Sequence, residues 1–180
     1  MPTYSFTLIV AGADLQTDAA QDALFEAGCD DATFGVSAGV QHAAFDREAP
    51  SFFEALRSAI AAVETAVPGA RMIRVEPDEL VTMSEIADRV GRTRESIRLL
   101  VAGERGPGGF PAPASRPTAR NPLWRWPQVA RWLNEQLGVH IQSDIPWHLV
   151  VAVNAAFELR RQLPELTDDE RGLVEHLRSA

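Results

Sequence analysis

Residues 82–101 read TMSEIADRVGRTRESIRLLV and predict two short helices joined at Gly91. The segment Thr82–Glu85 has the spacing of a capping box, in which a hydroxyl and a carboxylate satisfy backbone groups at a helix start. We expect the first helix over 83–90 and the second over 94–101. In the second helix, apolar residues recur on one side and polar residues on the other, so one face packs inward and one stays accessible.

This arrangement is the layout of a helix-turn-helix, because a tight turn joins two short helices and arginines begin the second. A helix N-terminus that points at DNA offers N–H groups to a phosphate, and side chains of its first turns reach base edges in the major groove. Thr93 is also placed to cap the second helix. We expect DNA contacts from the turn and this helix, through Arg92, Thr93, Arg94, Glu95, Ser96 and Arg98.

The residues after the second helix predict a β-hairpin wing with a long tip. Glycines and prolines over 103–111 exclude a helix, and the chain stays polar and broken by prolines until Leu123. Pro127 then occupies the first turn of a helix that Gly138 ends. We expect wing contacts with DNA from Arg105, Arg116, Arg120 and Arg125. The aromatic residues expected in the core are Trp124, Trp126 and Trp132.

These elements, in this order, resemble the winged helix-turn-helix of MerR-like and AlpA/excisionase-like regulators. The resemblance covers residues 80–138. It is carried by the segments 83–87, 91–98, 108–111, 124–127 and 129–133. It implies that the second helix enters the major groove and that the wing contacts the adjacent backbone or minor groove. The loop between Phe110 and Leu123 is longer and more basic than a minimal wing requires.

Charge is distributed unevenly along the chain, which has a formal net charge of -8. Residues 1–78 contain four arginines and twelve acidic residues, and residues 139–180 contain four and seven. Residues 79–138 contain nine arginines and six acidic residues. A phosphate responds to local potential more than to net charge, so the basic middle segment is compatible with nucleic acid. The alternative is compositional, because the chain has no lysine and arginine must supply every basic surface residue.

Residues 1–78 predict an α+β domain. The expected strands are 4–10, two short strands within 32–46, and 72–76, and the expected helices begin at about Thr17 and at Ser51 and end at Gly28 and Pro68. The order βαββαβ, with two helices over one face of an antiparallel sheet, is that of ferredoxin-like domains. Asp30 and Asp31 are interpreted as solvated charge, and Cys29 beside them as a poor nucleophile because negative charge disfavours the thiolate.

Residues 139–180 predict a third, helical segment. Asp144 can cap a helix that begins near Ile145, and residues 149–159 are apolar on nearly every side. Such a helix has to be covered all round, so we expect residues 145–159 to pack on their own domain and across a homodimer. A capping box at Thr167–Glu170 predicts a final helix.

The sequence contains no pattern that predicts catalysis or cofactor binding. No Ser/His/Asp set, paired carboxylates or phosphate-cradling glycine loop is visible, and the isolated histidines do not form a zinc motif. The first residues lack the basic stretch and apolar run of a secretory signal, and no run approaches the ~18 apolar residues of a membrane span. We therefore expect a cytoplasmic protein without catalytic residues, cofactor, metal or membrane contact.

The sequence as a whole predicts a sequence-specific protein that binds double-stranded DNA, as a bacterial transcriptional regulator acting as a homodimer. Its expected domains are 1–78, 79–138 and 139–180. The first would pair subunits, sense a small-molecule effector or bind a protein partner. Two alternatives stay open: an antitoxin or adaptor whose acidic first domain binds a protein partner, and an excisionase-like architectural factor that bends DNA.

Overall fold

The computed structural model describes residues 1–141 and 144–179. It divides into two compact units. The first unit comprises Met1–Pro77 together with His148–Ala180, and the second comprises Asp78–Trp147. The C-terminal helices therefore belong to the same unit as the N-terminal sheet. Across the two described ranges, no helix combines the length and the apolar character that a membrane span requires.

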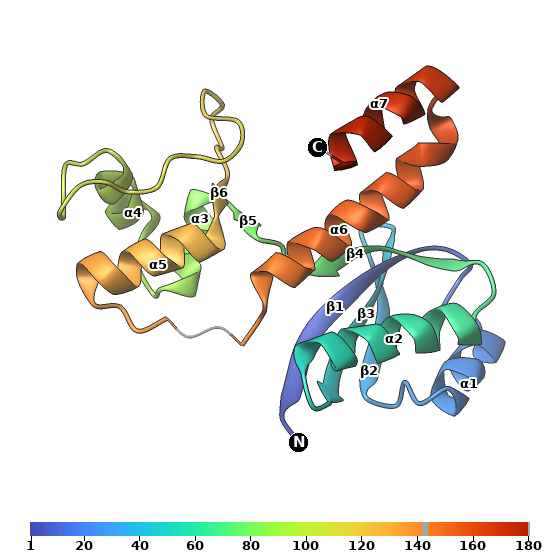
Figure 1. Ribbon diagram of the computed structural model, residues 1–180. Coiled ribbons are helices and arrows are strands. Elements are labelled where there is room, and N and C mark those ends of the chain that lie inside the picture. The colour runs from blue at the N-terminus through green and yellow to red at the C-terminus, as the bar shows by residue number, and fades with distance from the viewer. Residues whose placement is uncertain (142–143, 180) are drawn as a thin grey trace. The chain divides into compact units, whose positions relative to one another are not determined.

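A four-stranded antiparallel sheet with two helices makes up the N-terminal part of the first unit (Figure 1). The elements are β1 Thr3–Gly12, α1 Asp18–Glu26, β2 Ala32–Ser37, β3 Val40–Glu48, α2 Phe52–Ala66 and β4 Ala70–Glu76. The strand order is β2-β3-β1-β4, so β1 is central and β4 forms an edge. This confirms the predicted order of strands and helices.

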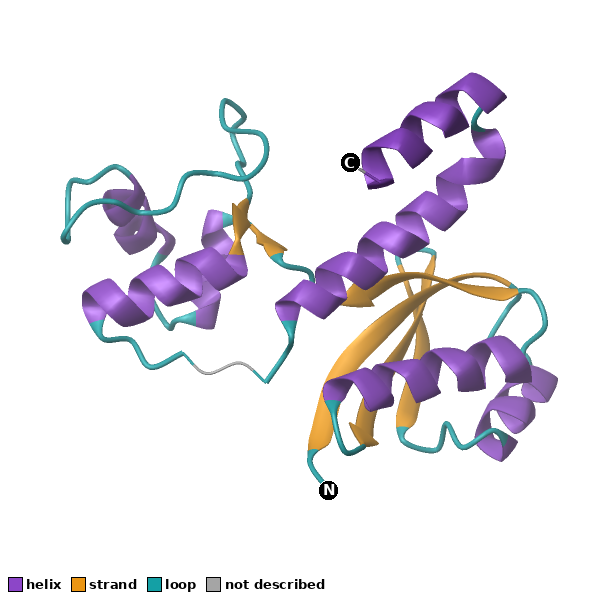
Figure 2. Ribbon diagram, in the orientation of Figure 1, coloured by secondary structure: helices purple, strands orange, loops and turns teal. Residues whose placement is uncertain are grey.

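Alternation along β1 gives the sheet one buried face. Phe6, Leu8 and Val10 are at most 4% exposed, and α1 and α2 lie on the same side of the sheet (Figure 2). Between β2 and β3 the chain reverses at Ala38 and Gly39, whose φ angles of 50° and 79° suit a two-residue hairpin turn. Helix α1 begins at Asp18, and the Thr17 hydroxyl caps it by accepting a hydrogen bond from the Ala20 N–H.

Asp31 forms an ion pair with a buried arginine, so its interpretation as solvated charge was wrong. Arg47, on β3, is 7% exposed, and its Nε and Nη2 each donate to the Asp31 carboxylate at 2.7 Å. The same guanidinium donates to the Gly28 carbonyl at 2.7 Å and lies over the Phe45 ring. Burial raises the pKa of the neighbouring Cys29 thiol, which keeps this cysteine protonated.

The C-terminal segment folds as α6 Trp147–Gln162, the 3-10 helix η1 Leu163–Glu165 and α7 Asp168–Ser179. Helix α6 lies along the edge strand β4. The Asn154 side chain accepts from the Val75 N–H at 2.7 Å and donates to the Val75 carbonyl at 3.0 Å. It therefore occupies backbone groups that an edge strand would otherwise leave open.

Helix α6 is covered on one side only within a single chain. Only Val150 and Phe157 are buried, and its other apolar residues are half-buried or exposed. Within one chain, the first unit therefore covers one side of α6. Helix α7 begins at the predicted capping box, in which Thr167 and Glu170 exchange hydrogen bonds.

The second unit contains three helices and a small two-stranded sheet. Its elements are β5 Leu80–Val81, α3 Met83–Arg89, α4 Arg94–Val101, β6 Trp124–Arg125 and α5 Trp126–Leu137. Strand β6 pairs antiparallel with β5, although α3, α4 and the long loop lie between them in the sequence. Within the long loop before β6, a single bridge joins Ser115 to Leu123. The segment predicted as a wing is therefore a long loop with one bridge, and β6 at its end pairs with the two residues of β5.

Candidate nucleic-acid interface

A tryptophan-centred core holds the helices of the second unit in place. Trp124 is 1% exposed and its indole N–H donates to the Pro111 carbonyl at 3.1 Å, which fixes the loop after α4 to the core. Trp126 and Trp132 are 5% and 8% exposed. The remaining buried members of this cluster are Val81, Ile86, Ala87, Ile97, Leu100, Val129 and Leu133. The three tryptophans are thus core residues, as the sequence predicts.

The turn between α3 and α4 follows from its capping residues. Thr82 and Glu85 form a complete capping box at the start of α3, and the Thr82 N–H lowers the pKa of the Glu85 carboxyl. Gly91 has a φ of 62°, a backbone conformation that favours glycine. The Thr93 hydroxyl accepts from the Ser96 N–H at 3.1 Å and caps α4. Thr93 therefore has a structural role, apart from the DNA contact predicted for it.

Helix α4 exposes Arg94 and Glu95 in its first turn, with Ser96 half-buried beside them. Arg94 is the first residue of the helix and Arg92 lies in the turn before it. Within the described ranges, no carboxylate pairs with either arginine. Both guanidinium groups therefore keep their N–H donors available for phosphate oxygens or base edges.

Arg98 has a different environment from Arg94. Its Nε donates to Glu95 at 2.9 Å, and its Nη1 and Nη2 donate to Glu104 at 3.1 and 3.2 Å. Glu104, and then Glu95, raise the pKa of Arg98 above its ordinary value, while Arg98 lowers the pKa of Glu104. One cation between two carboxylates gives this trio a net negative charge. The DNA contact predicted for Arg98 would require an exchange of these partners.

The bridged loop carries two exposed arginines at its tip. Arg116 has a positive φ of 52°, and its carbonyl accepts from the Ala119 N–H at 3.0 Å, which forms a turn. Arg120 follows this turn and is exposed. Neither side chain pairs with a carboxylate of the described residues, and the same holds for Arg105 in the preceding loop. Arg125, by contrast, is ion-paired with Glu79.

The structure brings Arg94 and Arg120 to the same small hollow, although 25 positions separate them in the sequence. Thr82, Ser84 and Asn121 supply further polar groups to its lining. Its volume of about 20 Å³ leaves room for about one water molecule, so it is a surface depression and not a ligand cavity. The start of α4 and the tip of the bridged loop therefore meet at one place on the surface.

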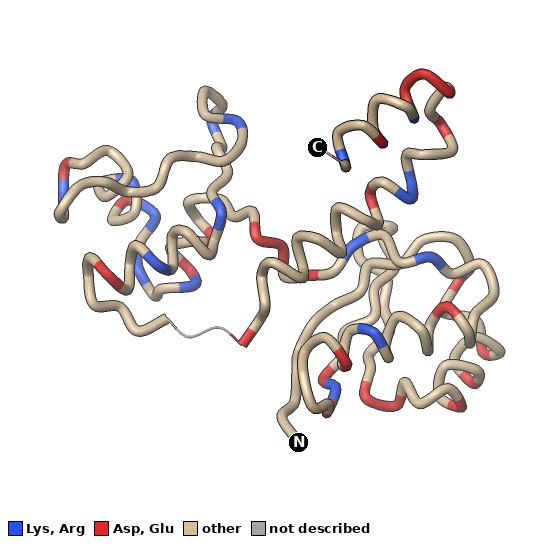
Figure 3. The backbone as a smooth tube through the Cα atoms, viewed as in Figure 1, with Lys and Arg blue, Asp and Glu red and all other residues tan. Residues whose placement is uncertain are grey.

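We define the arginine surface by Arg92, Arg94 and Arg120, the predicted residues whose donors are unpaired and which lie at the turn, the helix start and this hollow. Figure 3 shows arginines recurring along the second unit, whereas acidic residues dominate the sheet and helices of the first. Sequence reasoning missed Ser84 and Asn121, because neither has a charge or spacing that marks it out.

Within residues 1–141 and 144–179, no group of three or more His, Cys, Asp or Glu side chains is placed to hold a metal ion. The arrangement can donate hydrogen bonds to anionic or polar acceptors. Comparisons with protein-family models, with curated protein sequences and with solved structures find no match to this chain.

Proposed function

We propose that this protein binds double-stranded DNA in a sequence-specific manner through its second unit, as a transcriptional regulator with the architecture of a winged helix-turn-helix behind a ferredoxin-like sheet. The observation that carries the proposal is the meeting of Arg94 and Arg120 at one hollow, with their donors unpaired. One arginine begins the second helix, and the other lies on the wing.

The geometry of DNA explains why an arginine at a helix start and a second arginine on a neighbouring loop suit a duplex. The major groove admits one α-helix, and residues of the first turn of that helix reach base edges. Arg94 and its neighbours in α4 would therefore specify the site. Arg120, on a loop beside the helix start, would contact the adjacent backbone and set the register. Arg92, in the turn, would bind a phosphate.

The distribution of charge between the units supports the assignment of DNA to the second. Residues 78–147 contain nine arginines and eight acidic residues, whereas the first unit contains eight arginines and seventeen acidic residues. Nine minus eight gives the second unit a net charge of +1, and eight minus seventeen gives the first a net charge of -9, so a duplex would approach the second unit in preference to the first. Ion pairing reduces the contribution of Arg98 and Arg125, so they are weaker candidates than the arginine surface.

We further propose that the protein acts as a homodimer, because regulators of this kind read paired half-sites. Helix α7 supports this proposal: it buries no residue, and Leu173 and Leu177 are 60% and 66% exposed at a spacing that places them on one side. Light scattering should give about twice the chain mass of 19.7 kDa. A monomer at micromolar concentration for the wild type would contradict the homodimer, and an unchanged dimer in L173D/L177D would exclude α7 from the interface.

The test of sequence-specific binding is selection from a random duplex library with the purified full chain. We expect an enriched motif, and we expect Arg94→Ala to weaken binding to the selected duplex by about 1 to 3 kcal/mol and to relax preference at one base position. Arg131→Ala is the matched control, because Arg131 is an exposed arginine of α5 outside the hollow. Failure to enrich any motif, or equal effects of the two variants, would refute the proposal.

A further inference from the structure

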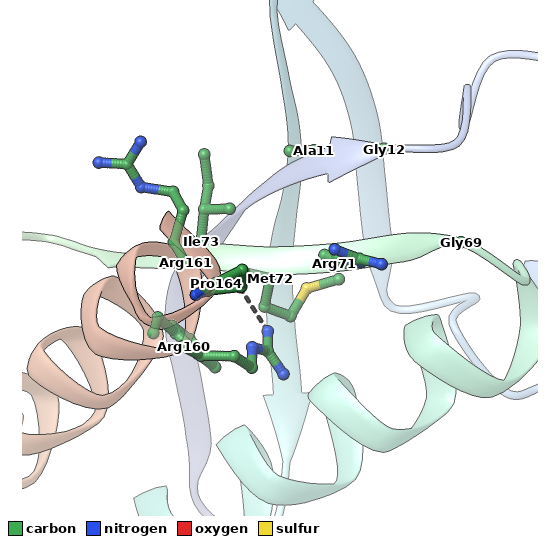
Figure 4. Close-up of a pocket in the computed structure, with 10 residues that line it drawn as sticks. Ala11, Gly12, Gly69, Arg71, Met72, Ile73, Arg160, Arg161 and Pro164 are labelled. Atoms are coloured by element: carbon green, nitrogen blue, oxygen red, sulfur yellow. Dashed lines mark hydrogen bonds between the residues drawn. The ribbon is translucent and has the colours of Figure 1, made fainter. Parts of the chain in front are cut away.

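A cavity of about 520 Å³ lies within the first unit, where β4 meets α6 and η1 (Figure 4). The ends of β1 and β4, the last turn of α6 and η1 together supply its walls. Its volume falls in the range of small-molecule sites, roughly 300 to 1,000 Å³. It is separate from the arginine surface, which belongs to the second unit.

Part of the cavity lining is apolar. Met72 and Ile73 line it from β4, Phe157 from α6 and Pro164 from η1. Met72 and Phe157 are themselves buried, at 1% and 9% exposure, so they are fixed parts of the wall. Such a wall suits the hydrocarbon part of a ligand, because burial of apolar surface on both sides is favourable.

Three residues of the lining are cationic. Its ten lining residues include Arg71, Arg160 and Arg161 and contain no aspartate or glutamate. This is unusual in a unit where acidic residues outnumber arginines by about two to one. An anionic ligand would therefore find positive potential here within an otherwise negative unit.

The three arginines differ in their existing partners. Arg160 donates to the Met72 carbonyl at 2.7 Å and pairs with Glu64 at 3.2 Å, and its guanidinium lies over the Phe157 ring. Arg161 pairs with Glu158 and points away from the other two in Figure 4. The Arg71 side chain has no hydrogen bond or ion pair with any described residue. One guanidinium of the lining therefore keeps its N–H donors for a ligand.

We propose that this cavity binds a small molecule with an apolar body and one carboxylate, which Arg71 engages through two parallel N–H donors. A planar guanidinium matches the geometry of a carboxylate, and the apolar wall accepts the rest of the molecule. Arg160 is a positioning residue that fixes α6 to β4 and so keeps the cavity open. The proposal does not depend on DNA binding.

Calorimetric titration of the full chain tests the site, with octanoate as the probe. Octanoate should bind, whereas 1-octanol lacks the charge and acetate lacks the apolar body, so each should bind at least tenfold more weakly. Arg71→Gln should weaken octanoate about tenfold or more, as expected for loss of a charged hydrogen bond, and Arg71→Lys should recover part of the affinity. Arg57→Gln is the matched control, since it removes the same charge from α2, outside the lining.

Amide chemical shifts provide a second measurement, which does not depend on a variant. Octanoate should shift Ile73 and Phe157 in the wild-type chain and leave the second unit unchanged. The proposal is overturned if millimolar octanoate produces neither heat nor these shifts. It is also overturned if octanol binds as tightly as octanoate, or if Arg57→Gln weakens binding as much as Arg71→Gln.

Discussion

Arginine serves opposite purposes in the two units of this molecule. In the first unit, Arg47 is 7% exposed and its guanidinium is bound by Asp31 and by the Gly28 carbonyl. In the second unit, Arg94 and Arg120 are exposed and no described carboxylate pairs with them. The Arg47 guanidinium therefore links segments of the first unit, whereas those of Arg94 and Arg120 are available to an external partner.

The number of arginines in a segment therefore does not indicate how many can bind a ligand. The partners of each guanidinium group indicate this better. Arg98 shows this within a single helix, because it lies four residues from Arg94 and yet is held between Glu95 and Glu104. The pair with Glu95 has the i,i+3 spacing of a helix, whereas Glu104 lies beyond the end of α4 and helical spacing does not mark it as a partner.

We expect the largest effect on stability from removing the carboxylate that pairs with the buried Arg47. Asp31→Ala leaves the Arg47 guanidinium without its carboxylate and should lower the free energy of unfolding of the first unit by on the order of 3 kcal/mol. Far-UV circular dichroism in urea measures this loss. All four tryptophans lie in the second unit, so the tryptophan fluorescence transition should stay unchanged.

Arg57→Ala provides the control for that measurement. Arg57 pairs with Glu54 on α2, but the two side chains are 61% and 39% exposed. An exposed pair of this kind contributes little, so we expect a change within about 0.5 kcal/mol. Equal losses in the two variants would show that the buried and exposed arginines do not differ as we describe.

Removing a carboxylate partner of Arg98 should make its guanidinium group more available to DNA. Glu104→Gln removes one of the two carboxylates around Arg98, so DNA affinity should rise. If Arg98 then contacts a phosphate, the slope of log affinity against log salt should steepen by about 0.9. Fluorescence anisotropy across a potassium chloride series measures both quantities. Glu135→Gln, on the exposed side of α5, makes the same change of charge elsewhere and should have less effect. A loss of affinity in Glu104→Gln would argue against the electrostatic account.

The smallest expected effect concerns the capping box that orients α3. Glu85→Ala should cost about 1 kcal/mol at pH 7, measured by tryptophan fluorescence in urea. The pKa of Glu85 is lower in the folded chain than its ordinary value of 4.5, so its contribution is present above about pH 4.5 and is lost as the pH falls through the folded pKa. The difference in the free energy of unfolding between wild type and Glu85→Ala should therefore shrink below pH 4. A difference that is constant from pH 7 to pH 3 would exclude this role for the carboxylate.

Local patterns in the sequence predicted most of the elements. The alternation that ends at Val10, the capping boxes at Thr82 and Thr167, and the left-handed cap at Gly138 all depend on residues within a few positions of one another. Such signals depend on nearby backbone geometry, and therefore they can be recognised in a single sequence. The element order of the N-terminal sheet follows from them.

Contacts between distant segments could not be predicted in this way. Strands β5 and β6 have two residues each, which is too short for a periodic pattern, and they pair across the intervening helices. The interaction of Asn154 with Val75 depends on where α6 lies, which no local signal specifies. The meeting of Arg94 and Arg120 depends likewise on the path of the loop, so the sequence predicted both residues but not their proximity.

The most direct test of the DNA-binding proposal is the salt dependence of binding by wild type, R94A/R120A and the R131A control, with the selected duplex. If Arg94 contacts a base and Arg120 a phosphate of one duplex, the double variant should lose about 100-fold in affinity. Its salt slope should fall by about 0.9, because one phosphate contact is lost. R131A should remain within about threefold of wild type. Equal affinities and slopes for wild type and the double variant would contradict the account.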